Sequence, residues 1–360
     1  MHIETLRLID FRNYAEEQVE FSPGVNILTG RNGEGKTNLV EAVYLLSMGR
    51  SFRTNADAQM LRFGQERFSV RGTFEKDGES LTVEVGMEGR RKIISVDGVE
   101  RRKSADLLEQ AYTVLFSPDD LRIVSDDPEN RRRFMDRELF QIRPLYYLDV
   151  VKYRRVLRSR NLLLKERTPD GALLDIYDGY LAETGARIMT QRAHFALRLH
   201  EMSAEIQARI TGGRERLVVS YEPNIPNVEA EADAILACLR ERRAKDREAG
   251  TTTAGPHKDD LKILSDGVDL RAYGSRGQQR TAALSLKLAE LSLIKDETGV
   301  PAILLLDDVL SELDEERQRF LIGAFEGHQI LLTAAGLPDE IRHALPQSRI
   351  LRVEGGRLIV

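Results

Sequence analysis

Eight consecutive residues near the N-terminus constrain this chain more than any other stretch. Residues 30–37 read GRNGEGKT and fit the phosphate-binding pattern GxxxxGK[ST] at every fixed position. Backbone N–H groups must close around phosphate oxygens there, and glycine allows that approach because it has no Cβ. The predicted nucleotide-binding residues of this loop are Gly30, Arg31, Asn32, Gly33, Glu34, Gly35, Lys36 and Thr37. Lys36 is expected to reach the β- and γ-phosphates, and the Thr37 hydroxyl to bind Mg²⁺.

The flanking sequence places this loop between a strand and a helix. Residues 25–28 are apolar enough for a short buried strand, and residues 37–48 read as a helix. A helix that begins at the loop points its positive N-terminal end at the phosphates. A chance Gly-rich turn would not show strand, loop, Lys-Thr and helix in this order, so we expect a nucleoside triphosphate site.

Composition limits the class of protein. The chain has 360 residues, enough for two domains, and a single cysteine, Cys238, which excludes a disulfide framework and suits a reducing compartment. We expect a cytoplasmic protein with no membrane contact, because no apolar run approaches the length of a membrane span. The net charge is −5, so any contact with nucleic acid must come from local basic surface.

The order of elements predicts one α/β domain made from both ends of the chain. Residues 68–74, 81–87 and 92–96 read as an antiparallel meander, and residues 112–116 as a further strand. The pattern then becomes mostly helical, with one strand at residues 217–221 and a loop through Pro223 and Pro226. From about residue 251, strands and helices alternate again and end in a hairpin of residues 349–353 and 358–360. The predicted domains are residues 1–117 with 251–360 (lobe I) and an inserted helical lobe, 118–250 (lobe II).

One long helix of the inserted segment has a continuous apolar face. Within residues 184–210 the apolar positions recur at intervals of three, four or seven, and they are Ile188, Phe195, Leu199, Met202 and Ile206. This face is either the core of a helical lobe, which we favour, or a short coiled-coil hairpin.

Two carboxylates follow an apolar strand late in the chain. Residues 302–306 read AILLL and lead directly into Asp307 and Asp308. In a phosphate-loop fold this strand is expected beside the first one, which would let Asp307 hold Mg²⁺, most simply through water. Asp308 would then orient or activate the attacking water. Lys36, Asp307 and Asp308 are the predicted catalytic residues.

A third motif indicates the subclass. Residues 274–280, GSRGQQR, stand just before a long helix and about thirty residues ahead of the acidic strand. They resemble the signature loop, LSGGQ, of the ATP-binding-cassette (ABC) superfamily. The resemblance implies a head-to-tail homodimer with two ATP molecules between the subunits, in which Ser275, Gly277 and Gln278 contact the partner's nucleotide. The alternative is an ordinary Ser N-cap of the helix.

Other positions fit or depart from the same superfamily. Residues 311–314, SELD, resemble the D-loop of the dimer interface, although Asp314 could also cap the next helix. The superfamily commonly has Glu where Asp308 stands and His after the later strand, where this chain has Thr333. These departures imply slow hydrolysis, with ATP serving as a clamp more than as fuel.

Blocks along nearly the whole chain resemble the RecF family of bacterial recombination-repair proteins, which belongs to the SMC-like group with a split ATPase head. They are FRNY at residues 11–14, GRSFRT at 49–54, SPDDL at 117–121 followed by Pro128 and RRRFMD at 131–136, and GPHKDD at 255–260. The resemblance implies an α/β ABC-type ATPase head that dimerises around ATP and Mg²⁺ and binds duplex or gapped DNA and single-strand junctions. It also implies partners RecO and RecR, which together promote RecA loading. Residues 117–120 occupy the region where a metal-contacting glutamine is expected.

Basic residues offer candidate DNA contacts that would neutralise phosphates without reading bases. The predicted contacts are Arg131, Arg132, Lys152, Arg154, Arg155 and Arg158, in stretches that also carry Arg133, Arg160, Lys165 and Arg167. Rival positions are Arg50, Arg53, Arg90, Arg91 and Lys92. His257 has no His or Cys at ligand spacing, so we expect it to position its loop.

Two other classes remain open at this point. A transport ATPase subunit would have a much shorter gap between Lys36 and Asp307. A chromosome-organising ATPase of SMC type needs long arms that a chain of this length does not supply.

Overall fold

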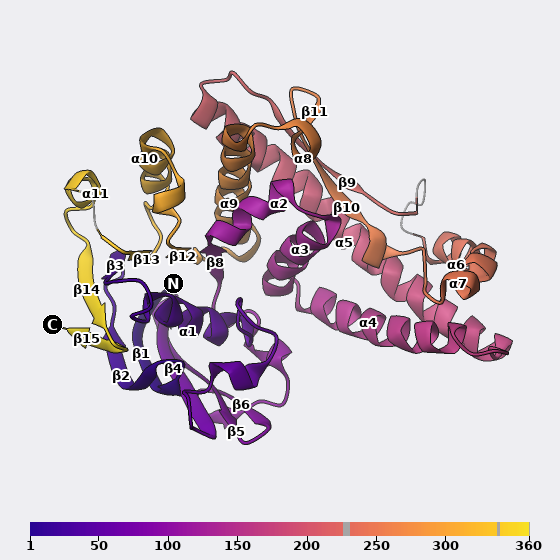
Figure 1. Cartoon of the computed structure of the whole chain (residues 1–360), viewed down its shortest axis with the longest axis horizontal. Helices are drawn as coiled ribbons and strands as arrows, with labels where there is room; N and C mark the ends of the chain where they lie inside the picture. Colours follow the sequence, from indigo (N-terminus) through magenta and orange to yellow (C-terminus); the bar gives the residue numbers. More distant parts are fainter. Residues whose placement is uncertain (226–230, 337–338, 360) are drawn as a thin grey trace. The chain divides into compact units, whose positions relative to one another are not determined.

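The computed structural model describes residues 1–225, 231–336 and 339–359 (Figure 1). The chain separates into two compact units, Met1–Leu121 with Leu286–Val360 (unit 1) and Arg122–Ser285 (unit 2). The second boundary lies well after residue 250, the position expected from sequence. The reason is that β10 (Asp260–Ser265) pairs antiparallel with β9 (Leu217–Glu222) and so belongs with unit 2. Pro226 and Val360 of the predicted loop and hairpin lie outside the described residues.

Unit 1 contains a mostly parallel sheet that confirms the predicted α/β head. Its strand order is β15-β14-β3-β13-β12-β8. The strands are β3 (Val25–Thr29), β8 (Thr113–Phe116), β12 (Ile303–Asp307), β13 (Ile330–Ala334), β14 (Arg349–Glu354) and β15 (Arg357–Ile359). β3, β13, β12 and β8 are nearly all buried apolar residues, as expected of strands covered on both faces.

From the sequence we expected the acidic strand β12 to lie directly beside the phosphate-loop strand β3. This expectation is wrong, because another strand lies between them. β13 lies between β3 and β12 and pairs in parallel with both. Asp307 is level with Thr333 of β13, and Thr333 is level with Leu28 of β3. The carboxyl ends of the three strands therefore meet at one edge, and the intervening strand adds a polar side chain there.

The second sheet of unit 1 is antiparallel and includes the predicted meander, in the order β2-β1-β4-β5-β6-β7. Its strands are β1 (His2–Phe11), β2 (Tyr14–Glu20), β4 (Arg67–Lys76), β5 (Glu79–Glu88), β6 (Arg91–Val96) and β7 (Val99–Glu100). Helix α1 (Lys36–Met48) contacts strands of both sheets and is buried on nearly every side. Double burial explains why its sequence is apolar almost throughout.

Unit 2 is mostly helical, as predicted. Its helices are α2 (Arg122–Ser125), α3 (Pro128–Ile142), α4 (Pro144–Leu164), α5 (Gly171–Thr211), α6 (Ala232–Glu241), α7 (Arg243–Ala249) and α8 (Leu270–Tyr273), and its sheet order is β11-β10-β9 with β11 at Val268–Asp269. Helix α9 (Arg276–Thr298) begins in unit 2, and α10 (Glu315–Gly323) and α11 (Asp339–Ala344) belong to unit 1. Short 3₁₀ turns are η1 (Asp57–Met60), η2 (Ser104–Leu107), η3 (Pro118–Leu121), η4 (Pro256–Lys258) and η5 (Leu310–Glu312).

The long helix α5 decides between lobe and coiled coil. It packs against α4, α6 and β9, and Ile188, Phe195 and Leu199 of the predicted apolar face are buried. Met202 and Ile206 are half-buried. A helix with partners on several sides is the core of a lobe, as favoured from sequence. Among the described residues, no helix combines the length and the apolar character that crossing a bilayer requires.

Buried charges and rings hold unit 2 together. Arg160 is fully buried, and its guanidinium donates to Asp178 and Asp246 at 2.6 and 2.7 Å. This arginine, which the sequence placed in a basic stretch, is therefore part of the core. Removing one partner of such a buried pair costs several kcal/mol, about 3 to 5, because the other charge stays buried.

His257 lies in the same interior. Its Nε2 is 2.9 Å from the Thr252 carbonyl oxygen, and its Nδ1 is 2.8 Å from the Tyr153 hydroxyl. Since a carbonyl only accepts, Nε2 carries the proton and Nδ1 accepts from Tyr153. Burial lowers the pKa of His257 to about 4, and the positive charges of Lys258 and Arg132 act in the same direction. The ring thus fastens the 255–260 loop to α4, the positioning role expected from sequence.

We expect acid to destabilise the protein through His257. Its pKa is lower in the folded chain than in the unfolded one, so between about pH 6.5 and 4 the unfolded chain binds the extra proton. The loss accumulates as the pH falls through this window, to about 3 kcal/mol, and saturates below it. Chemical denaturation at several pH values measures it, and His257→Gln, whose amide can still donate to Thr252, should remove most of this pH dependence. An unchanged slope in that variant would contradict the assignment.

Candidate nucleotide site

The phosphate loop connects the end of β3 to the start of α1 and depends on its glycines. Gly30, Gly33 and Gly35 all have positive φ angles, 148°, 87° and 120°. A Cβ on Gly30 would lie 2.3 Å from the Val353 carbonyl oxygen, and one on Gly35 would lie 2.9 Å from the Tyr14 hydroxyl. Both the conformation and the space therefore require glycine, and the loop is held in one shape.

Two neighbouring turns fasten this loop from outside. The Asn13 side-chain amide donates to the Glu34 carbonyl at 2.8 Å, and the Gly356 N–H donates to the same carbonyl at 2.9 Å. The Glu34 carboxylate also accepts from the Gly355 N–H, and the Tyr14 hydroxyl donates to the Gly35 carbonyl at 3.0 Å. The FRNY block and the C-terminal hairpin thus support the loop backbone.

Lys36 begins α1 and is largely buried. Its ammonium donates to the carbonyl oxygens of Gly30 and Arg31 at 2.6 and 2.9 Å. Burial lowers the pKa of Lys36, whereas the carboxylates of Asp308, Asp307 and Glu34 raise it. The carbonyl oxygens of the loop thus hold the Lys36 ammonium at the phosphate-binding site.

Thr37 and the acidic strand come together despite being far apart in the sequence. The Thr37 hydroxyl donates to Asp307 Oδ1 at 2.7 Å, and the Thr333 hydroxyl donates to the same oxygen at 3.0 Å. Burial raises the pKa of Asp307, and these two hydrogen bonds lower it. A hydroxyl and a carboxylate in contact are hard oxygen donors of the kind that Mg²⁺ prefers, so the residues present fit a magnesium ion.

Asp308 has an unusual backbone. Its φ is 54°, a left-handed value that is uncommon for a residue other than glycine. Its N–H donates to the Thr333 hydroxyl at 2.9 Å, and its carbonyl accepts from the Ser311 hydroxyl at 2.7 Å. Thr333, noted from sequence only as a departure from histidine, therefore bridges the two acids.

Sequence reasoning missed Glu41, on the helix that follows the loop. Its fully buried carboxylate accepts from the Arg12 guanidinium, with Nε at 2.8 Å, and from the Ser51 hydroxyl. Arg53 Nη1 lies 3.4 Å from Glu41 and donates to the Asn38 amide oxygen at 2.8 Å. The available signal was a single acid inside an apolar helix, together with nearby Arg12, Ser51 and Arg53. Glu41 thus ties α1 to the GRSFRT loop.

The predicted signature loop, in unit 2, forms a reciprocal helix cap. The Ser275 N–H donates to the Gln278 side-chain oxygen at 3.0 Å, and the Gln278 N–H donates to the Ser275 hydroxyl at 3.2 Å. This is the capping-box arrangement at the start of α9. Ser275 and Gly277 are exposed. The N-cap alternative is thus realised, and contact with a partner's nucleotide stays a prediction.

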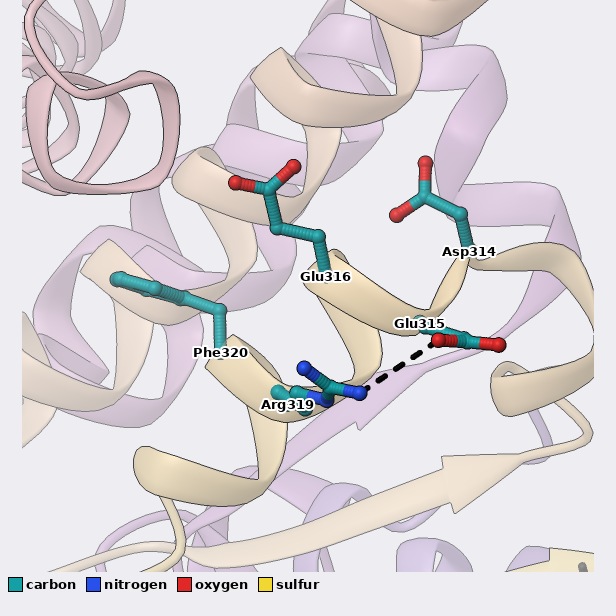
Figure 2. A pocket seen from close by; sticks show the side chains of 5 residues that line it. All are labelled: Asp314, Glu315, Glu316, Arg319 and Phe320. Atoms are coloured by element: carbon teal, nitrogen blue, oxygen red, sulfur yellow. Dashed lines mark ion pairs between the residues drawn. The ribbon is translucent and has the colours of Figure 1, made fainter. Parts of the chain in front are cut away.

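The predicted D-loop and the region expected to hold a glutamine are also capped turns. The Asp314 carboxylate accepts from the Arg317 N–H at 3.0 Å and caps α10. Figure 2 shows the five side chains that line a pocket there, among them Glu315 and Arg319, which form an ion pair. Their charged atoms are 3.5 Å apart. At the other turn, Asp120 accepts from the Ser117 N–H and hydroxyl at 2.7 and 3.0 Å.

The structure separates the predicted DNA contacts. Arg131 is buried, and its guanidinium donates to both carboxylate oxygens of Asp260, so it has no face left for a phosphate and its prediction is wrong. Arg132 is half-buried and donates to the Asp259 carbonyl at 2.6 Å. The remaining four lie exposed on α4 and stay predictions: Lys152, Arg154, Arg155 and Arg158.

The rival DNA positions also differ in their surroundings. Lys92 donates to the Gly49 carbonyl at 2.6 Å and pairs with Asp57 at 3.0 Å. Arg53 belongs to the Glu41 cluster, and Arg91 pairs with Glu100. Arg90 is exposed at the turn between β5 and β6.

Comparison with known proteins identifies the family. Residues 2–333 match the family model described as RecF/RecN/SMC N terminal domain. The chain is 40% identical over 364 residues to the DNA replication and repair protein RecF of Clostridioides difficile (strain 630), covering 100% of this chain and 98% of that one. It is 37% identical over 359 residues to RecF of Clostridium perfringens (strain SM101 / Type A), covering 99% of both. The chain belongs to the RecF family.

Solved structures agree with this membership. A structure described as the recombination mediator protein RecF-ATPrS in the RecFOR pathway superposes with a TM-score of 0.92 at 34% identity, covering 99% of this chain and 97% of the other. The Smc head domain from Pyrococcus furiosus superposes with a TM-score of 0.58 at 15% identity, covering 99% and 96%, a likeness of fold alone. The RecF family thus accounts for the ABC-type ATPase head predicted from sequence.

We expect Asp307→Asn to stabilise the protein when no nucleotide is bound. Because the folded pKa of Asp307 is raised, its ionised form costs stability above that pKa, whereas Asn keeps an oxygen for Thr37 and Thr333. The free energy of unfolding should be higher than that of the wild type at pH 7, and the gain should vanish below the ordinary pKa of an aspartate, about 4. Urea denaturation measures both values. Thr333→Val, which leaves the Asp308 N–H unpaired, should instead lose about 1 to 2 kcal/mol. A less stable Asp307→Asn at pH 7 would contradict this account.

Proposed function

We propose that this chain binds ATP with Mg²⁺ in the phosphate loop and hydrolyses it slowly. The observation that carries the proposal is the contact of the Thr37 hydroxyl with Asp307 at the mouth of a loop that requires glycine at Gly30 and Gly35. Lys36 would hold the β- and γ-phosphates, while Thr37 and Asp307 would hold the magnesium ion. The RecF relatives of known structure include one described with ATP.

Hydrolysis would depend on Asp308. Its backbone is fixed by Thr333 and Ser311 at the end of β12, which directs the residue toward the nucleotide end of the sheet. A carboxylate there can orient or activate water, but Asp is shorter than the Glu common in ABC proteins. Slow turnover would make ATP a clamp that is released on hydrolysis.

ATP would also join two copies of the chain. Ser275, Gly277 and Gln278 lie at a helix start, where backbone N–H groups and the helix dipole favour an anion. In the ABC arrangement these groups contact the nucleotide of the partner subunit. The exposed Ser275 hydroxyl would exchange its bond with the Gln278 N–H for a γ-phosphate oxygen.

The cellular role would be that of a recombination mediator acting in the cytoplasm. The closed dimer would bind duplex or gapped DNA and, with RecO and RecR, promote the loading of RecA onto single strands. Family membership and a RecF structure described within the RecFOR pathway support this role. The same membership argues against a transport subunit. A chromosome-organising protein of SMC type would need arms longer than α5, whose 41 residues make it the longest helix of the described chain.

We expect the solution mass to double with ATP and Mg²⁺ for the wild type only. Lys36→Met removes the phosphate contact, and Ser275→Arg places a bulky cation in the signature loop, so both should stay monomeric. Ser220→Arg, an exposed strand serine of unit 2, is the matched control and should dimerise normally. Light scattering measures the masses. A Ser275→Arg protein that dimerises like wild type would show that the loop is only a helix cap, although the nucleotide site would stand.

DNA binding should be electrostatic and coupled to ATP. With ATP, two duplexes of unrelated sequence should bind with the same affinity, and log K should fall linearly with log salt by about 0.9 for each phosphate contact. Lys36→Met should bind duplex more weakly because it forms no dimer. Fluorescence anisotropy at several salt concentrations tests this. If Lys36→Met and the wild type bind duplex DNA with equal affinity, DNA binding does not depend on the ATP-bound dimer.

A further inference from the structure

Helix α4 of unit 2 has two different faces. The inner face packs into the lobe through buried Tyr146, Val150, Tyr153 and Leu164, together with the core arginine Arg160. Figure 1 shows α4 running alongside α5, the helix to which it is packed. This face alone accounts for the position of α4 in the fold.

The outer face carries a second regular pattern. Every residue of this outer strip is exposed, and its members follow one another at spacings of three and four: Leu148, Val151, Arg155, Arg158 and Leu162. This alternation is the spacing of the core positions of a coiled coil, which form one seam along a helix. Leu145, 77% exposed, lies beside the N-terminal end of the strip but one position off its seam.

Exposed apolar side chains arranged in a seam are unusual for a helix with a free surface. Leu162 is 68% exposed and Leu148 44%, although both side chains are large and apolar. A solvated face would carry polar residues at these positions. Apolar patches with a polar rim are typical of interaction sites, which makes the strip a candidate docking surface.

Charge identifies the occupant. The two central seam positions are Arg155 and Arg158, and the flanking positions include Lys152 and Arg154. Arg154 pairs with Asp136 at 2.8 Å, and Lys152 lies over the Tyr180 ring at 4.7 Å. Within the described part of the chain, Arg154 alone of these four has a carboxylate partner. The one acid among residues 148–162 is Asp149, which pairs with Arg187 of α5 at 2.7 Å and occupies neither a seam nor a flanking position.

We propose that the outer strip of α4 binds an amphipathic helix of another protein, with apolar residues at its ends and carboxylates at its centre. Apolar ends would pack on Leu148, Val151 and Leu162, and central carboxylates would pair with Arg155 and Arg158. A second copy of α4 fits poorly because arginines would face arginines. The outer surface of duplex DNA is lined by phosphates, on which the leucines cannot pack, so the structure favours protein over the DNA contact expected from sequence. The proposal does not depend on ATP.

The test uses two synthetic helical peptides, each three heptads long, and the full-length protein. The acidic probe carries Leu at the outer core positions and Glu at the two central ones, and the basic probe has Lys in place of Glu. In fluorescence anisotropy the acidic probe should bind wild type at least about tenfold more tightly than the basic probe does. Leu148→Ser with Leu162→Ser should weaken the acidic probe by about tenfold or more.

A charge swap keeps the test independent of folding. Arg155→Glu with Arg158→Glu should lose the acidic probe and gain the basic one, a gain that a misfolded protein would not show. Equal binding of both probes to wild type, or no effect of the swap, would overturn the proposal. Two further results would also overturn it. If neither probe binds and Arg155→Ala with Arg158→Ala lowers the affinity for duplex DNA, the strip is a DNA contact. If the protein forms a dimer without nucleotide and Leu148→Asp breaks that dimer, the strip binds a second copy of the chain.

Discussion

The hydrogen bond from Thr37 to Asp307 is the interaction on which unit 1 depends. It joins the helix that follows the phosphate loop to a strand 270 residues later, across β13. The inserted unit 2 separates these residues in sequence, so the site exists only when both chain ends fold together. Burial raises the pKa of Asp307, and the hydroxyls of Thr37 and Thr333 oppose that effect. Burying the ionised carboxylate of Asp307 costs free energy, and a metal ion bound to it would stabilise its negative charge.

The phosphate loop itself was predictable because its chemistry is local. Glycines at fixed positions, Lys36 and Thr37 follow from the shape and charge of phosphates, and the flanking strand and helix follow from periodicity. The structure adds the reason why Gly30 and Gly35 tolerate no side chain. The Val353 carbonyl and the Tyr14 hydroxyl occupy the space, and both come from distant strands. Such close approaches have no signature in the sequence of the loop.

Strand order and charge burial were the parts that sequence did not determine. A parallel strand contains no record of its neighbours, so the placement of β13 between β3 and β12 depends on packing of the whole sheet. The sequence does not show whether an arginine is exposed to solvent or buried in an ion pair. Arg131 and Arg160 stand in basic stretches yet are buried against carboxylates from elements far away in the chain. Glu41 was hidden in the same way, inside a helix that reads as apolar.

Thr333 stands where the superfamily commonly has histidine, and it has a structural role of its own. Its hydroxyl donates to Asp307 and accepts from the Asp308 N–H, so one small side chain connects both acids. The left-handed backbone of Asp308 costs about 1 kcal/mol or more for a residue other than glycine, and the bond to Thr333 offsets part of that cost. The chain therefore fixes the direction of Asp308 through the backbone, and a fixed but short carboxylate suits a site that holds ATP longer than it turns it over.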